Sequence, residues 1–469
     1  MAVPKRFRLV EIEWPEFGLC DLPPGPSVTE FEARIDAARS AMEERGLTHL
    51  VVYGDREHFA NLTYLTGFDP RFEEALLILA RQGDPLLVVG NECESYLPVS
   101  PLYATGKLRG ERYQPFSLLN QPRGDSRLII EIFAGEGIGR GSQVGCAGWK
   151  YLSEPEHPGA AHALELPAYL VDTLRELAGW ENVVNATAVL MHPGHGLRTT
   201  CSPSEIAYFE YTNVLASEGM KRMIFGLQEG MTDHELARLV EYNGEPLACH
   251  LAMGTGDTHL LGLASPRGAT IRRGDPLSTN LSYWGSNSCR AGWVASSASD
   301  VPPKARDYVE TFAGTYFEVM CEWYSLLRIG MPGDTLARLV DERLPFEQFG
   351  ITLNAGHLIH LDEWLSSPIY LGSDLPLRSG MAIQADVIPS SPIYFSTRME
   401  DGVVLADGSL RGQLQAEYPE CFARCQGRRA FMIDVLGIDL PEEVLPLANI
   451  PAIVPPFFLE PNRVLALES

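Results

Sequence analysis

The first 195 residues alternate between two hydrophobic patterns. Apolar residues recur at helical spacing over residues 28–46, and Gly46 is a typical helix stop. Short apolar runs at 48–54, 75–80 and 85–90 are typical of buried strands, and the last two are joined by a hairpin-type turn. A second helix and a further strand follow. This alternation predicts a small α/β domain with a mostly buried sheet.

The remainder of the chain opens with a linker and contains an internal repeat. The linker is rich in Gly, Pro, Ser and Thr, and Ser202 or Ser204 is expected to cap the long helix that follows it. The sequences GMTDHELARLV (230–240) and GMPGDTLARLV (330–340) are similar, which predicts a duplicated α+β unit. The proline-rich tail is expected to run over the surface without regular structure.

Composition narrows the class of partner. The 469 residues include 37 Lys and Arg against 61 Asp and Glu, a formal net charge of −24. This excess argues against nucleic acid and against an anionic membrane surface, because both are bound through clustered Lys and Arg. We expect no secretory signal and no membrane-spanning helix, since no apolar run approaches ~20 residues. The nine scattered cysteines are typical of a reducing cytoplasm, where we expect the protein to be located.

Four segments contain polar residues in otherwise apolar or Gly-bounded surroundings, and they are candidates for the functional site. These segments are residues 254–262, 272–292, 354–364 and 379–408. The last is expected to form two strands, with Asp386 among Ile and Val and with Arg398 and Glu400 on one strand face. An ionisable group on a strand face is costly unless it is paired or functional. These side chains are therefore candidate site residues.

Several short motifs follow one another along the chain in a characteristic order. The N-terminal part contains the sequence THLVVYGDREHFANLTYLTGF after a helix with Arg34, and four motifs follow: Gly-Asp at 274–275, Gly-His at 356–357, Gly-Met at 380–381 and Arg-x-Glu-Asp at 398–401. From about residue 28 to 435 the chain resembles the creatinase/aminopeptidase P family. The resemblance implies a creatinase-type α/β domain (1–195), an α+β pita-bread catalytic domain with a pseudo-twofold repeat (196–435), and an extension (436–469).

The resemblance also implies a set of metal ligands that this chain keeps only in part. Metallopeptidases of the family bind two divalent ions with two Asp, one His and two Glu. The His and the two Glu fall on His357, Asp386 and Glu400. A second family histidine, seven residues after the first, falls on Trp364, which is expected in the substrate pocket.

The two aspartate ligands are missing. Their positions fall on Asn280 and on Ala291, or on Asn287 if the alignment shifts by four residues, and none of these is a carboxylate. Hard divalent ions need carboxylate oxygens, so we expect no paired metal centre and no cofactor. A single ion on the three remaining ligands, with water or Asn280 as a fourth, stays open as an alternative.

The metal-free members of the family, the creatinases, suggest a catalytic histidine. The matching residue is His259, whose ring Asp257 could orient; imidazole suits the role because its pKa of about 6.5 lets it take and give a proton near neutrality. The alternatives are a substrate-contacting histidine or an ordinary loop residue. His360 and Glu363 are expected to form pocket wall.

The resemblance further implies a homodimer whose site is completed in trans. Arg71 falls in the loop where creatinase has an arginine that reaches the partner's site, and an arginine there could bind a substrate carboxylate. The alternative is a solvated loop arginine. No partner other than a second copy and a small-molecule substrate is expected.

These residues together predict a creatinase-like, metal-independent hydrolase of a C–N bond in a small, polar, carboxylated substrate. Glu400 and Asp386 would hold its amidino or amino group, while His357 and Arg398 would order the pocket. Three alternatives stay open: a metal-dependent Xaa-Pro aminopeptidase or dipeptidase, a lyase acting on a small zwitterion, and a non-catalytic binding module.

Overall fold

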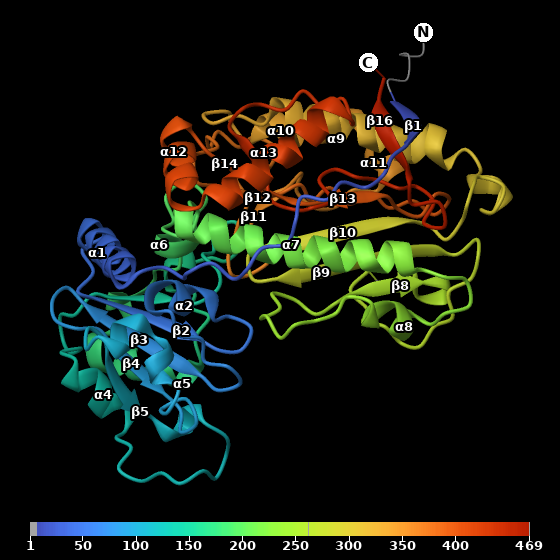
Figure 1. Cartoon of the computed structure of the whole chain (residues 1–469). Helices are drawn as coiled ribbons and strands as arrows, with labels where there is room; N and C mark the ends of the chain where they lie inside the picture. The colour runs from blue at the N-terminus through green and yellow to red at the C-terminus, as the bar shows by residue number, and fades with distance from the viewer. Residues whose placement is uncertain (1–6, 261, 469) are drawn as a thin grey trace. The chain divides into compact units, whose positions relative to one another are not determined.

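The computed structural model describes residues 7–260 and 262–468, and these form two compact units (Figure 1). One unit comprises Gly25–Thr199. The other combines the described residues before Gly25 with those after Thr199. The boundary thus lies close to the predicted one at residue 195, but the predicted extension 436–469 is part of the second unit and not a separate segment.

The first unit is built on a six-stranded mixed sheet with the order β5-β4-β3-β2-β6-β7. The antiparallel run β2-β3-β4 confirms the three strands expected from the apolar runs, and β5, β6 and β7 join in parallel. All residues of β2 and β4 are buried, which explains their continuous apolar sequence. The strands are β2 (His49–Gly54), β3 (Ala75–Ala80), β4 (Leu86–Val89), β5 (Arg109–Arg112), β6 (Val144–Ala147) and β7 (Val183–Asn185).

Helices complete this unit. Ser27 caps the first helix by accepting a hydrogen bond from the Glu30 amide, and two later helices, α4 and α5, share a hydrophobic core with the sheet strands. The helices are α1 (Val28–Glu44), α2 (Ala60–Thr66), α3 (Pro101–Ala104), α4 (Ile129–Gly135), α5 (Ala168–Ala178) and α6 (Ala188–Met191). The predicted α/β class of this unit is therefore confirmed.

Two four-stranded antiparallel sheets form the centre of the second unit. The first has the order β13-β10-β9-β8, with β8 (Met253–Thr255), β9 (Pro276–Tyr283), β10 (Ser286–Trp293) and β13 (Arg398–Glu400). The second has the order β11-β12-β14-β15, with β11 (His357–Leu358), β12 (Ala382–Gln384), β14 (Gly402–Leu405) and β15 (Val444–Pro446).

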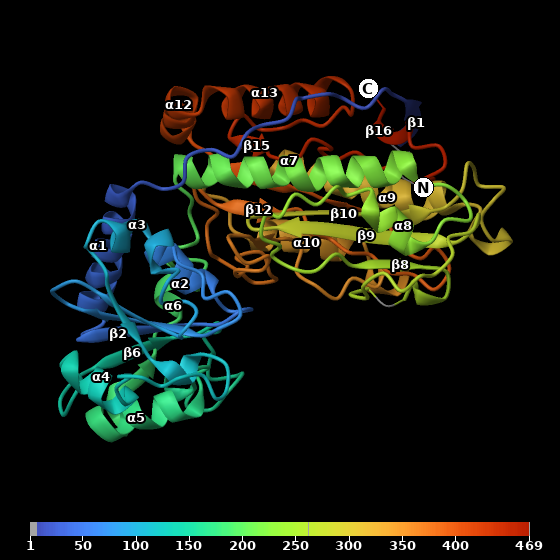
Figure 2. The same ribbon diagram turned by 60° about the horizontal axis from the view of Figure 1, so that its bottom comes forward.

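The longest helix of this unit runs beside the first sheet. It is α7 (Pro203–Gly226), which packs on β9 and β10 (Figure 2). Ser202 caps it and Glu205 reaches back to the Ser202 amide, so the predicted cap is confirmed as a reciprocal capping box. The other helices are α8 (Asp233–Arg238), α9 (Gly314–Leu326), α10 (Asp334–Arg343), α11 (Phe346–Phe349), α12 (Gly408–Glu417) and α13 (Pro419–Asp434).

The repeat predicted from the sequence is a structural repeat. In each copy the Gly-Met turn precedes a short helix, α8 or α10. The turn also forms a backbone hydrogen bond to a later segment of the chain. Gly230 donates a hydrogen bond to Ile271 at 2.8 Å, and Gly330 donates one to Leu377 at 2.8 Å. The pattern is thus the same in both halves, as expected for a duplicated unit.

The proline-rich tail differs from its prediction. It forms the strands β15 and β16 (Arg463–Leu467), and β16 pairs antiparallel with β1 (Phe7–Glu11) near the N-terminus. Residues 450–458 between these strands are buried. The expectation of an extended surface segment was wrong because the apolar residues between the prolines provide enough hydrophobic surface to be part of the core.

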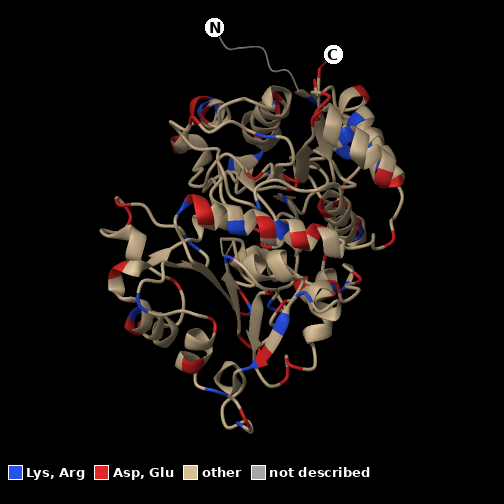
Figure 3. Ribbon diagram, turned by 90° about the vertical axis from the view of Figure 1, so that its left-hand side faces the viewer, with Lys and Arg blue, Asp and Glu red and all other residues tan. Residues whose placement is uncertain are grey.

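Charge is dispersed over the ribbon. In Figure 3, Lys and Arg positions lie among Asp and Glu positions on the side that faces the viewer. Among the helices of the described residues, none combines the length and apolarity needed to cross a membrane.

Candidate functional site

The β9–β10 hairpin and β13 provide one face of the candidate site. Cys289 on β10 pairs with Asn280 on β9 and with Glu400 on β13. Paired residues of an antiparallel sheet point to the same face, so these three side chains lie together. Arg398 pairs with Ala291 two positions along, which confirms that Arg398 and Glu400 share a face.

The second sheet brings in the histidine and the second acid. His357 begins β11 and pairs with Gln384 of β12, and Asp386 follows β12 by two residues. The His357 Nε2 lies 3.7 Å from the Asp386 Oδ2. Ligand atoms of His357, Asp386 and Glu400 all lie within 4.8 Å of one another. The three residues predicted from the sequence are therefore brought together.

Glu363, expected from the sequence in the pocket wall, lines the pocket and belongs to the same cluster. Its Oε1 lies 3.4 Å from the His357 Nε2, and Asn287 Nδ2 approaches it at 3.5 Å while donating to Glu400 Oε1 at 2.8 Å. A bridge between Leu358 and Ser366 folds the segment after β11 back on itself and places Glu363 over His357. Glu363 is thus more than pocket wall: it is a third carboxylate of the site.

Trp364 covers the histidine. Its ring stacks on the His357 ring at 4.1 Å with an interplanar angle of 24°, and His357 is fully buried. His360, expected in the pocket wall, lies elsewhere, with its Nε2 3.1 Å from the Glu205 Oε1. The aromatic cover shields His357 from solvent, which strengthens its electrostatic interactions with the neighbouring carboxylates.

The cluster contains more acid than base. Burial raises the pKa of Asp386 to about 6, and burial together with Asp386 raises the pKa of Glu400 well above its usual range. Burial lowers the pKa of His357, but the carboxylates of Glu363 and Asp386 outweigh this and the net shift is upward. Burial raises the pKa of Glu363, but His357 outweighs it and lowers the pKa. Such a cluster favours a bound cation.

A cavity of about 260 Å³ opens over these residues. We call it the site cavity. Its polar lining includes Asn280, Asn287, Glu363, Asp386, Arg398 and Glu400. Its apolar lining includes Ala252, Leu263, Leu353, Trp364 and Ile388. Among the described residues that line it, Arg398 is the one Lys or Arg.

The register of the hairpin places Cys289 opposite Asn280. Of the two candidates for the second aspartate position, Asn287 lines the site cavity and donates to Glu400, whereas Ala291 is buried, pairs with Arg398 and is not part of the lining. The assignment of that position stays a prediction. The Cys289 Sγ accepts a hydrogen bond from Arg398 at 3.4 Å. Cys289 is therefore a site residue that sequence counting missed.

Cys249 places a second thiol beside Asn280. Its Sγ accepts a hydrogen bond from the Asn280 Nδ2 at 3.4 Å, while the Asn280 Oδ1 accepts one from the Ala252 amide at 2.6 Å. Asn280 is thus held by protein groups on both ends of its amide, which leaves it a wall residue of the cavity.

His259 lies on a different segment from the cluster. Its Nδ1 contacts the carbonyl of Gly256, and its ring meets Phe395 edge to face at 5.6 Å. Asp257 is exposed, and the contact at the His259 Nδ1 is with a backbone carbonyl, so orientation of the ring by Asp257 stays a prediction. His259 is not among the residues of the cavity lining, and its catalytic role stays a prediction.

Arg71 lies in the first unit in a left-handed backbone conformation, with φ of 58°. Its Nε lies 3.3 Å from the Asp69 Oδ2, and its guanidinium donates to the Tyr96 hydroxyl at 2.7 Å. The side chain is half exposed. Its proposed reach into a partner's site stays a prediction.

The donor set fits one divalent ion and not two. The buried Nε2 of His357 and Oδ1 of Asp386 make no hydrogen bond, and with Glu400 they offer the nitrogen and oxygen ligands that such ions take. On the neighbouring strands β9 and β10, the paired residues Asn280 and Cys289 are not carboxylates, and a second ion would need further oxygen ligands of that kind.

Comparison with known proteins agrees with this fold. Residues 34–109 match the family model of the creatinase/prolidase N-terminal domain. No curated protein matches the chain significantly.

Solved structures match over most of the chain. The prolidase from Pyrococcus horikoshii has 16% identity and a TM-score of 0.61, over 80% of this chain and 95% of that one. Prolidase from Pyrococcus furiosus has 18% identity and a TM-score of 0.59, over 79% and 96%. Escherichia coli aminopeptidase P with substrate has 15% identity and a TM-score of 0.56, over 86% and 100%. The chain therefore carries a segment of the creatinase/prolidase N-terminal domain, and its fold is the pita-bread type of the prolidases and aminopeptidase P.

Proposed function

We propose that this protein is a hydrolase that cleaves the amide C–N bond of a small substrate with a cationic group, with the help of one divalent ion. The observation that carries the proposal is the cluster of Glu363, Asp386 and Glu400 around the unbonded Nε2 of His357. The buried carboxyl groups of Asp386 and Glu400 and the partly exposed one of Glu363 line the same cavity as one guanidinium, an excess of acid that suits an ion and a substrate ammonium.

The similarity to prolidases and to aminopeptidase P supports a metal-assisted hydrolase over the metal-independent enzyme expected from the sequence. The metal-independent, creatinase-like reaction is the second candidate. It is favoured by one observation: the paired residues Asn280 and Cys289 are not carboxylates, and Arg398 supplies a fixed positive charge beside Cys289. The homodimer, its completion by Arg71 and a cytoplasmic location remain proposals.

Each residue of the site has a distinct part in the proposed reaction. His357, Asp386 and Glu400 would hold the ion, which when bound supplies Lewis acidity for amide hydrolysis. Glu363 stays ionised beside His357 and can accept the substrate's ammonium group. Asn287 orients Glu363 and Glu400 through its amide.

Proton transfer is assigned to His259. Its Nδ1 is engaged by the Gly256 carbonyl, which fixes the ring and leaves the Nε2 to take a proton from water and return it to the leaving amine.

The proposal is tested by hydrolysis. We expect the chain, supplied with Mn²⁺, Co²⁺ or Zn²⁺, to release amine from at least one member of a panel of amino acid amides, Xaa-Pro dipeptides, guanidino acids and N-methyl amino acids. His357→Ala should abolish this release, because it removes the nitrogen ligand. Turnover that survives dialysis against a chelator would instead support the metal-independent candidate, and a panel left intact under all conditions would contradict both.

Replacing His259 should affect turnover and leave folding intact. We expect His259→Ala to lower kcat by ~10²-fold or more, the usual size for a general acid–base residue. Its thermal unfolding should match that of the parent chain, since a half-buried loop histidine makes few packing contacts. His157→Ala, at an exposed histidine of the first unit, is the matched control. Near-full turnover of His259→Ala would assign the proton transfer to another group.

A further inference from the structure

The site cavity is lined both by acidic residues and by exposed leucines. Glu363, Asp386 and Glu400 gather at one end, whereas Leu263 and Leu353 line the same cavity although their side chains are 82% and 50% exposed. Exposed leucines beside a charged cluster keep apolar surface in contact with water, which costs free energy until a ligand covers it. The cavity therefore presents an acidic end and an apolar rim.

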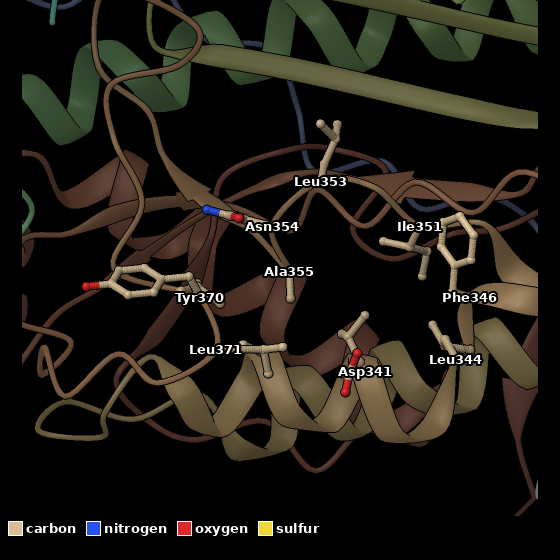
Figure 4. A pocket seen from close by; sticks show the side chains of 12 residues that line it. Asp341, Leu344, Phe346, Ile351, Leu353, Asn354, Ala355, Tyr370 and Leu371 are labelled. Atoms are coloured by element: carbon tan, nitrogen blue, oxygen red, sulfur yellow. The ribbon is translucent and has the colours of Figure 1, made fainter. Parts of the chain in front are cut away.

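The apolar surface continues beyond the rim. A second cavity of about 240 Å³ is lined by Leu344, Ile351, Leu353 and Leu371, so Leu353 belongs to both cavities. Figure 4 shows Leu353 at the edge of this second cavity, with its side chain pointing away from Leu344 and Leu371. A ligand that extends past Leu353 thus finds a further apolar surface.

Among the described residues, neither cavity places a Lys or Arg near the rim. The one Lys or Arg among the described lining residues is Arg398, which is engaged by Cys289 and lies near Asp386 and Glu400. The second cavity adds a further acid, Asp341. A substrate carboxylate in this space would find uncharged donors such as Asn354 and Tyr370, but its charge would be opposed by the nearby acids and not balanced by a cation at the rim.

We propose that the substrate has a cationic head that binds at the acidic end and an apolar body, without a carboxylate, that lies against Leu263 and Leu353. This inference rests on the proposed function for the reaction itself, but it names the substrate class. It replaces the carboxylated substrate expected from the sequence, and it separates this chain from an enzyme for dipeptides with a free C-terminus. Leu353 is then a specificity-determining residue.

Two matched pairs of probes test the proposal. Leucyl-pyrrolidide and leucyl-proline differ by one carboxylate, and so do hexylamine and 6-aminohexanoate. We expect calorimetric titration of the full chain to show that the carboxylate-free member of each pair binds at least about tenfold more tightly, because like charges across an interface are strongly unfavourable. Equal binding within the pairs, or tighter binding of the carboxylates, would overturn the proposal.

A positive charge introduced at Leu353 should reduce the difference in affinity between the two members of each pair. We expect Leu353→Arg to bring each pair to within about threefold, since an arginine there pairs with the carboxylate. Leu119→Arg, at a leucine that is 92% exposed in the first unit, is the matched control and should keep the tenfold preference. Both sites are exposed, so both variants should unfold at the parent's temperature. A preference unchanged in a folded Leu353→Arg would overturn the role of Leu353.

The binding test and the hydrolysis test distinguish a failure of the substrate class from a failure of the proposed function. If hexylamine binds as expected but no amide is cleaved, the substrate class stands and the proposed function fails. If leucyl-pyrrolidide and leucyl-proline are cleaved with equal kcat/KM, the proposed function stands and the substrate class fails.

Discussion

Replacing Glu400 by glutamine is expected to reduce amide hydrolysis by ~10²-fold or more, the scale of losing a group that acts on the reacting atoms. Glu400 is buried, offers a ligand atom within 4.8 Å of those of His357 and Asp386, and is oriented by Asn287. Glutamine keeps the volume and the hydrogen bond from Asn287 but removes the negative charge. The loss should therefore appear in kcat and in ion affinity, with the fold unchanged.

The control for this variant is Glu417→Gln. Glu417 lies exposed at the end of α12 and is not among the residues that line the site cavity, so its replacement should leave turnover unchanged. Steady-state kinetics at saturating ion measure both variants. A Glu400→Gln enzyme with the parent's kcat and ion affinity would remove Glu400 from the site.

The second large effect is on stability. Asp401 receives the buried guanidinium of Arg290 through two hydrogen bonds of 3.0 and 2.8 Å, and Arg290 also donates to the carbonyls of Ile450 and Ile453. Removing one partner of a buried ion pair leaves the other uncompensated, so Asp401→Ala should lower the free energy of unfolding by ~3–5 kcal/mol. Denaturant unfolding followed by far-UV circular dichroism measures this loss.

The matched control for Asp401 is a surface pair. Glu322 lies 2.7 Å from Arg343, and both side chains are exposed, so Glu322→Ala should change the free energy of unfolding by no more than ~1 kcal/mol. If Asp401→Ala lowers the free energy of unfolding no more than this control does, the buried pair does not stabilise the packing of the tail on β10. If it is costly as expected, the pair also explains how the tail supports the strand that carries Cys289.

The cluster residues could be predicted from the sequence because each stands in a local motif. Arg398 and Glu400 alternate at a strand spacing, so the local pattern places them on one face, whereas His357 is identified through the Gly-His motif of the family resemblance. Ser202 and the helix it caps could be predicted for the same reason: capping depends on residues within one turn.

The place of Cys289 in the site, and that of Glu363 beside His357, could not be predicted because both depend on contacts between segments. Cys289 faces Asn280 only through the register that the hairpin turn imposes, and a shift of register moves every side chain of a strand. Glu363 reaches His357 only because the segment folds back after β11. The tail was misjudged for a related reason: its partner strand β1 lies at the opposite end of the chain.

We expect the cluster of His357, Asp386 and Glu400 to hold one divalent ion. The most direct measurement is elemental analysis of the chain after equilibration with Mn²⁺ or Zn²⁺ and removal of free ion, beside Glu400→Gln. The account predicts one ion per parent chain and none in the variant, because the paired residues Asn280 and Cys289 of the neighbouring strands are not carboxylates. Two ions per chain, or one ion that the variant retains, would contradict it.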